Sequence, residues 1–263
     1  MRLLIRFALF ALVAVEVGGA AAQSLPYTKF TEWMTLTDAS VSVDVYLPSE
    51  ASPQGVAILA HGFGGTRKGN RDLAQALAAA GFVAIAPDLP GFLDPQRNAE
   101  AIITLVHHLE TGNAGIAAVP RNRLVLVGTS MGGLAAVLAA AELSGIAGWV
   151  GLDPVDQARS GARAATRINA PAVVLLAKPS ICNLNGNGSA IARAAPGLLR
   201  SSVVEGASHC DFEGPTNSVC RAACGRGSNA AQLFVREEAV RAVAQMLQAP
   251  DLRDARFWSE VND

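Results

Sequence analysis

Short, uninterrupted runs of apolar residues recur along most of the chain. They fall at residues 56–60, 83–86, 124–127, 147–152 and 173–177, with a weaker one near 202–204. Strands that are buried on both faces of a sheet have this pattern, which is typical of parallel sheets. Before these runs, residues 41–47 alternate apolar and polar side chains, which predicts a strand with one buried face.

Segments with helical spacing of apolar residues separate the runs. They predict helices over residues 71–80, 99–110, 131–143 and 236–247. Glycines follow the first three segments, as is common where helices end. Because strands and helices alternate, the sequence predicts one α/β domain with a doubly wound, mostly parallel sheet.

Composition narrows the class of protein. The chain has 263 residues, of which 51% are hydrophobic and 16% are charged. This balance is typical of a globular protein with a sizeable core. The formal net charge is −1 and no run of Lys or Arg occurs. A nucleic-acid partner is therefore not expected.

Residues 1–22 have the features of a signal peptide. A positively charged start precedes an apolar run over residues 7–15, and small residues before Gln23 offer a cleavage site. Because Glu16 interrupts the apolar run, a retained membrane anchor is the weaker interpretation. We expect a secreted or periplasmic protein, without stable membrane insertion, whose single domain spans residues 23–263.

Four cysteines follow the predicted cleavage site. They are Cys182, Cys210, Cys220 and Cys224. Export favours two disulfides, for which three pairings exist. Of these we favour Cys182–Cys210 with Cys220–Cys224, because Cys182 and Cys210 flank two polar loops. A metal site is not expected, because no His pair stands nearby at zinc-ligand spacing.

A candidate nucleophile lies in Gly128-Thr129-Ser130-Met131-Gly132. This G-x-S-x-G pattern directly follows a predicted buried strand and opens a predicted helix, as a nucleophile elbow requires. Glycines at its two ends allow the strand and helix to close together. A glycine-rich turn whose serine only caps the helix is the competing interpretation. The placement between strand and helix favours Ser130 as a nucleophile.

A second glycine-rich loop, His61-Gly62-Phe63-Gly64-Gly65, follows the strand at 56–60. Backbone N–H groups in such a loop can stabilise a developing negative oxygen. We assign an oxyanion hole to the N–H groups of Phe63 and Met131. Phe63, Gly64 and Phe212 are expected to contact the substrate, whereas His61 is expected to orient the loop.

The general base and its acid partner are found by elimination and by chain order. The histidines are His61, His107, His108 and His209. His209 follows the last apolar run, which fits the order Ser…Asp…His. Asp153 ends a buried strand and is the favoured acid, because a carboxylate there can orient the imidazole. Asp156 is the alternative.

The motifs together resemble the chlorophyllase-like and lipase-like serine esterases of the α/β-hydrolase superfamily. The resemblance rests on HGFGG at 61–65, AAAGFVAIAPDLPG at 78–91, GTSMGG at 128–133, GLDPVD at 151–156 and GASHCDF at 206–212. Because pancreatic-type lipases carry their acid in a GLDP block, the resemblance implies Asp153 as the acid. The GxSMG elbow and HGF are also similar to cutinase-like polyester hydrolases, in which the acid follows the next strand. Thr129 and Met131 differ from the elbow usual in plant chlorophyllases, so the resemblance implies fold and mechanism rather than chlorophyll as substrate.

These observations predict an exported carboxylic ester hydrolase that forms an acyl-enzyme and needs no cofactor. The stretch from Asp153 to Val173 is too short for a separate lid domain. An exposed cleft would accept small-molecule or polymeric esters with apolar or bulky groups. An amidase or peptidase with the same triad, and a non-catalytic binding protein, are the alternatives.

Overall fold

The computed structural model describes residues 26–49, 53–216, 218–225 and 227–248. The predicted signal peptide, residues 1–22, lies outside these ranges. Within them, the strands form an eight-stranded sheet in the order β1-β2-β4-β3-β5-β6-β7-β8. β2 runs antiparallel to β1 and to β4, and every other neighbouring pair is parallel. The predicted mostly parallel sheet is confirmed.

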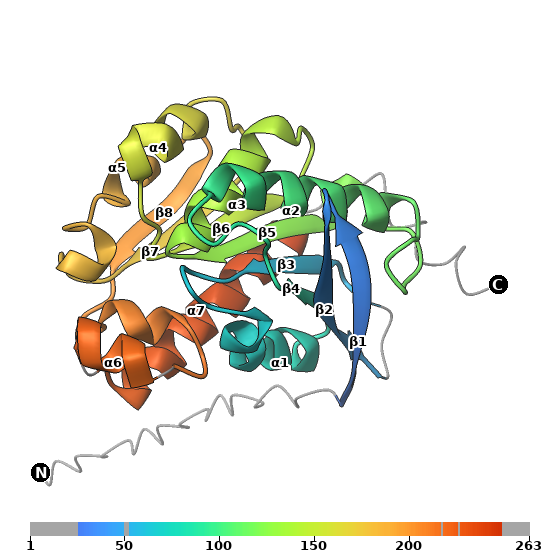
Figure 1. Ribbon diagram of the computed structural model, residues 1–263, viewed down its shortest axis with the longest axis horizontal. Coiled ribbons are helices and arrows are strands. Elements are labelled where there is room, and N and C mark those ends of the chain that lie inside the picture. The colour runs from blue at the N-terminus through green and yellow to red at the C-terminus, as the bar shows by residue number, and fades with distance from the viewer. Residues whose placement is uncertain (1–25, 50–52, 217, 226, 249–263) are drawn as a thin grey trace, which may run out of the picture.

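The helices and strands alternate along most of the chain (Figure 1). The strands are β1 (Tyr27–Leu36), β2 (Ala39–Pro48), β3 (Val56–Ala60), β4 (Val83–Pro87), β5 (Leu124–Thr129), β6 (Gly148–Leu152), β7 (Ala172–Leu176) and β8 (Leu198–Val203). The helices are α1 (Arg71–Ala79), α2 (Pro95–Glu110), α3 (Met131–Glu142), α4 (Ser160–Ala165), α5 (Ser189–Ala194), α6 (Ser218–Cys224) and α7 (Asn229–Gln248). Short 3₁₀ turns named below are η1 (Arg67–Asn70), η4 (Ile181–Asn183) and η5 (His209–Phe212).

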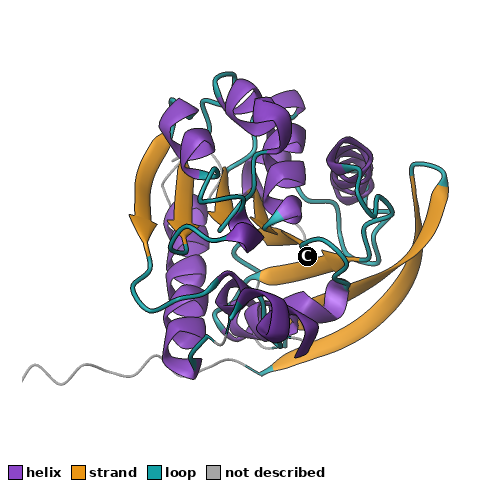
Figure 2. Cartoon of the chain, turned by 60° about the vertical axis from the view of Figure 1, so that its left-hand side comes forward, coloured by secondary structure: helices purple, strands orange, loops and turns teal. Residues whose placement is uncertain are grey.

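Helices cover both faces of the sheet (Figure 2). α2, α3, α4 and α5 pack on one face, and α1 and α7 on the other. Each central strand contributes alternate side chains to two separate hydrophobic cores. In β3, Ile58 points into the first core, while Ala57 and Leu59 point into the second. Burial on both faces explains why the central strands read as uninterrupted apolar runs.

The elements that the sequence did not predict are short or exposed. β1 lies at the sheet edge and leaves much of its surface in solvent, including Trp33 at 74% exposed. α4, α5 and α6 have six or seven residues, too few for a helical period to be clear. α7 begins at Asn229, before the predicted start at 236.

The connection between β6 and β7 contains a short 3₁₀ turn and α4. The expected absence of a large lid domain therefore holds for the described residues. Among those residues, none of the helices combines the length and the apolar character that a membrane span requires.

A buried carboxylate fixes the sheet edge beside the glycine-rich loop that follows β3. Asp44 on β2 is 2% exposed. It accepts hydrogen bonds from Thr31 Oγ1 at 2.6 Å, Lys29 Nζ at 2.8 Å and Arg67 Nε at 3.0 Å. Burial favours the neutral acid, but these three donors outweigh it and hold the Asp44 pKa below its ordinary value. Since Arg67 begins η1, the cluster ties this turn to the sheet.

The Asp44 cluster predicts an acid-sensitive contribution to stability. Because the pKa is lowered in the folded state, ionised Asp44 stabilises the fold above the unfolded pKa of about 4 and loses this effect as pH falls through the folded pKa. Asp44→Asn should lower the free energy of unfolding by about 1.5–3 kcal/mol at neutral pH, and by less in acid. Urea unfolding of the wild type and the variant, at neutral and at acidic pH, measures the two differences in the free energy of unfolding.

Asp38→Asn is the matched control, because the Asp38 carboxylate pairs with Arg97 but is 75% exposed. Surface ion pairs contribute little, so this variant should unfold like the wild type. Equal effects of the two substitutions would contradict the role given to Asp44.

Candidate active site

The turn between β5 and α3 holds Ser130 in a strained conformation. Ser130 has φ 54° and ψ −121°, a region that residues other than glycine rarely adopt. A Cβ on Gly128 would lie 2.3 Å from the Gly132 carbonyl oxygen, and one on Gly132 would lie 2.3 Å from the carbonyl oxygens of Ala60 and His61. Only glycine allows this close approach, so the G-x-S-x-G pattern has a structural cause.

Ser130, His209 and Asp153 meet at the carboxyl ends of the strands. His209 Nε2 lies 2.9 Å from Ser130 Oγ, and His209 Nδ1 lies 2.6 Å from Asp153 Oδ2. All three side chains are nearly buried. An ionised carboxylate only accepts hydrogen bonds, so Nδ1 carries the hydrogen and Nε2 is left to accept from the serine hydroxyl. This is the arrangement in which an imidazole can take a proton from a hydroxyl.

Two further donors hold the Asp153 carboxylate. The Ala177 N–H donates to Oδ1 at 2.9 Å, and Asn183 Nδ2 donates to Oδ2 at 3.1 Å. Asn183 is completely buried, and its Oδ1 accepts from the backbone N–H groups of Ser180 and Gly186. The sequence analysis missed the contact of Asn183 with Asp153, because an asparagine in a polar loop carries no pattern that marks such a role.

The alternative acid, Asp156, has another place in the structure. Its carboxylate accepts hydrogen bonds from the backbone N–H groups of Gly161 and Ala162. It therefore satisfies backbone N–H groups in the first turn of α4, as acidic residues near helix N-termini commonly do. His107 and His108 lie on α2, where His107 contacts Glu110 and His108 approaches the Thr35 carbonyl.

The glycine-rich loop after β3 lies against Ser130. Its Gly62 N–H donates to Glu213 Oε1 at 2.8 Å, and its Gly65 N–H donates to the Gly62 carbonyl at 3.1 Å. By contrast, the N–H groups of Phe63 and Met131 donate to no other described residue. Two unpartnered N–H groups beside Ser130 are what an oxyanion hole requires.

His61 ties the start of this loop to the segment after β4. The Leu89 N–H donates to His61 Nε2 at 2.9 Å, so Nδ1 carries the ring hydrogen and donates to the Gly62 carbonyl, also at 2.9 Å. His61 is 7% exposed. These contacts fit the structural role expected for it.

A cleft of about 690 Å³ opens over Ser130 and His209. Its walls are largely apolar and include Phe63 and Gly64. Phe63 is 54% exposed and packs against Phe92 in a tilted arrangement, with ring centroids 4.8 Å apart. The sequence analysis did not identify several other lining residues, namely Leu93, Val155, Gln157 and Ala223.

Phe212, which was expected to contact the substrate, lies elsewhere. Its side chain is 4% exposed and belongs to the core beneath α7. Its carbonyl accepts a hydrogen bond from Thr129 Oγ1. The 3₁₀ turn η5 directs His209 toward the cleft and turns Phe212, three residues later, into the core. In place of Phe212, the next residue, Glu213, reaches the cleft.

The disulfides join Cys182 to Cys224 and Cys210 to Cys220. The favoured pairing, Cys182–Cys210 with Cys220–Cys224, was therefore wrong. Cys220 and Cys224 lie one turn apart on α6, and this helix packs against both η4 and η5. Each cysteine thus reaches a different turn, and both bridges line the cleft. The sulfurs of Cys210, Cys220 and Cys224 cluster within 4.8 Å, but the disulfides leave no thiolate for a metal.

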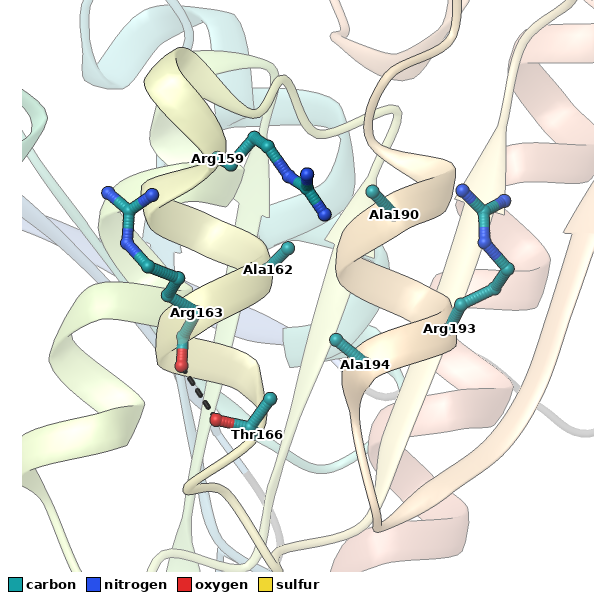
Figure 3. A pocket seen from close by; sticks show the side chains of 7 residues that line it. All are labelled: Arg159, Ala162, Arg163, Thr166, Ala190, Arg193 and Ala194. Carbon is teal, nitrogen blue, oxygen red and sulfur yellow. Dashed lines mark hydrogen bonds between the residues drawn. The ribbon is translucent and has the colours of Figure 1, made fainter.

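A second hollow of about 510 Å³ lies between α4 and α5 (Figure 3). Figure 3 shows Arg159 reaching between the two helices, with Arg163 and Arg193 on their outer sides. The remaining lining residues are alanines and Thr166. This lining contains no histidine, cysteine or carboxylate.

Comparisons with known proteins address the fold. Residues 57–259 match the profile of the Alpha/beta hydrolase family. A comparison with curated proteins gives no match. Among solved structures, the fold is similar to that of dienelactone hydrolase from Anabaena variabilis ATCC 29413, with a TM-score of 0.65 and 18% sequence identity. The similarity covers 83% of this chain and 98% of that chain, and at this identity it indicates a common fold alone.

The contacts of Asn183 predict a loss of stability when it is truncated. Asn183→Ala removes a donor from the buried Asp153 carboxylate and leaves backbone N–H groups without an acceptor. We expect the free energy of unfolding to fall by at least about 2 kcal/mol. Urea unfolding measures this, with the exposed Asn169→Ala as control. Equal stability of the two variants would contradict the role of Asn183.

The disulfide pairing predicts which peptides stay linked without reductant. Digestion under non-reducing conditions should give one linked species that contains Cys182 and Cys224, and another that contains Cys210 and Cys220. Thiols are blocked before digestion to prevent exchange. A Cys182–Cys210 species as the main product would contradict this pairing.

Proposed function

The chain belongs to the Alpha/beta hydrolase family, and we propose that it is a serine hydrolase that cleaves carboxylic esters. The observation that supports this proposal most strongly is the continuous line of hydrogen bonds from Ser130 through His209 to Asp153, with distances of 2.9 and 2.6 Å. Membership of the family alone would leave the reaction open, because one fold serves many chemistries. The proposal therefore rests on the site.

Ser130 is the proposed nucleophile and His209 the proposed general base. His209 Nε2 takes the hydroxyl proton as Oγ attacks the ester carbonyl, which forms a tetrahedral intermediate. When this intermediate collapses, His209 returns the proton to the leaving alcohol and the acyl group stays on Ser130. A water molecule then hydrolyses the acyl-enzyme by the same two steps.

Asp153 and the glycine-rich loop stabilise the charges that this cycle creates. The Asp153 carboxylate orients the ring of His209 and stabilises the imidazolium. The N–H groups of Phe63 and Met131 form the proposed oxyanion hole. Removal of one such donor costs about 3 kcal/mol of transition-state stabilisation in other enzymes, so the position of this loop has a large effect on rate.

The cleft favours esters with apolar groups. Its volume of about 690 Å³ is in the range of sites for small organic molecules. Exposed apolar side chains stand at its mouth, with Phe63 at 54%, Leu93 at 62% and Leu184 at 49% exposed. An open, apolar mouth suits bulky or polymeric esters as well as small ones.

Export is part of the proposal. Disulfides form and persist in oxidising compartments, and all four cysteines of the chain are paired. Together with the signal-like sequence of residues 1–22, this supports a secreted or periplasmic enzyme. Its catalytic domain would span residues 23–263.

Ester hydrolysis by the purified protein tests the proposal. The wild type should hydrolyse p-nitrophenyl esters in a series from acetate to palmitate, and Ser130→Ala should lower kcat by about 10⁴-fold or more. Ser144→Ala, in the turn after α3, is the matched control and should stay active. Assays with the corresponding p-nitroanilides distinguish esterase from amidase. A folded Ser130→Ala variant with wild-type turnover would contradict the proposed nucleophile.

A further inference from the structure

Among the described residues that line the cleft, Glu213 is the only Asp or Glu. It follows η5 and reaches across to the glycine-rich loop, where its Oε1 accepts the Gly62 N–H at 2.8 Å. A Cβ on Gly62 would lie 2.8 Å from this oxygen and 3.1 Å from Ser130 Cβ. The Glu213 carboxylate and Ser130 therefore both lie close to the Cα of Gly62.

The backbone around Glu213 is itself held in place. The Gly214 N–H donates to the Gly69 carbonyl at 2.8 Å, and the Asp72 N–H donates to the Gly214 carbonyl at 2.9 Å. Thr216 Oγ1 donates to the Glu213 carbonyl at 3.0 Å. Glu213 is thus a fixed acceptor that joins the loop of His209 to the loop of Phe63.

From these contacts we infer that Glu213 is a positioning residue for the oxyanion hole. Hydrogen bonds to an ionised acceptor are about twice as strong as neutral ones. The bond at Gly62 N–H fixes the peptide next to the one that carries the Phe63 N–H, in a loop where glycines leave the backbone few other restraints. Glu213 acts through Gly62, without touching the reacting atoms.

The charge of Glu213 also selects among esters. A carboxylate in a partly buried, largely apolar cleft repels an anion strongly, because the effective dielectric constant there is lower than that of water. Among the described lining residues, none carries a permanent positive charge to offset it. Glu213 therefore favours neutral esters over esters whose acyl group ends in a carboxylate. This inference rests on the proposed ester hydrolysis.

Two substitutions separate the two roles. Glu213→Ala removes the acceptor, and kcat for p-nitrophenyl valerate should fall at least about tenfold while KM changes less than about twofold, because the loss is confined to the transition state. Glu213→Gln keeps an acceptor oxygen, so kcat for this neutral ester should stay within about threefold of the wild type. For p-nitrophenyl hemisuccinate, Glu213→Gln should raise kcat/KM at least about fivefold relative to valerate.

Hydrogen exchange provides a readout that does not depend on catalysis. The Gly62 amide, observed by NMR, should exchange at similar rates in the wild type and in Glu213→Gln, and at least about tenfold faster in Glu213→Ala. Glu205→Gln is the matched control, because Glu205 is an exposed carboxylate in the segment before His209. It should match the wild type in every assay.

The outcomes are separable. Loss of the same kcat in Glu213→Gln and Glu213→Ala, or unchanged Gly62 exchange in Glu213→Ala, would overturn the positioning role. An unchanged preference between valerate and hemisuccinate in Glu213→Gln would overturn the charge selection. A folded wild type without ester turnover would defeat the proposed function, while Gly62 exchange would still decide whether Glu213 holds the loop.

Discussion

The close contact of β5, α3 and the end of β3 is the constraint on which the rest of the site depends. At Gly128 and Gly132 the backbones approach so closely that a methyl group would meet carbonyl oxygens at 2.3 Å. At this contact Ser130 adopts a positive φ of 54°. The contact also brings the start of α3 close to the glycine-rich loop, so one packing constraint positions both the proposed nucleophile and the proposed oxyanion hole.

The other site residues come from loops, and the structure restrains each loop differently. The buried amide of Asn183 orients Asp153. The segment of His209 is tied to the rest of the fold by the Cys210–Cys220 bridge and by Glu213, which contacts the loop of Phe63. Loops that carry function are commonly the least restrained parts of a fold. Here disulfides and buried polar contacts restrain these loops.

Much of this arrangement follows from patterns within short segments of sequence. The central strands are buried on both faces and read as apolar runs, and the G-x-S-x-G pattern follows from a backbone contact that only glycine permits. The favoured acid, Asp153, lies beside His209, and Asp156 accepts hydrogen bonds from N–H groups in the first turn of α4. The disulfide pairing, the burial of Phe212 and the contacts of Asn183 and Glu213 depend on how distant loops pack. No local pattern encodes these contacts, because each joins residues from separate elements.

The most direct test of this account is covalent labelling of the purified protein with a fluorophosphonate, followed by peptide mass spectrometry. The account predicts a single adduct on Ser130 in the wild type, strongly reduced labelling in His209→Ala, and none in Ser130→Ala. Labelling requires an activated serine but not a particular substrate, so it tests the site without knowledge of the natural ester. A folded wild type that takes up no probe, or an adduct on another serine, would contradict the account.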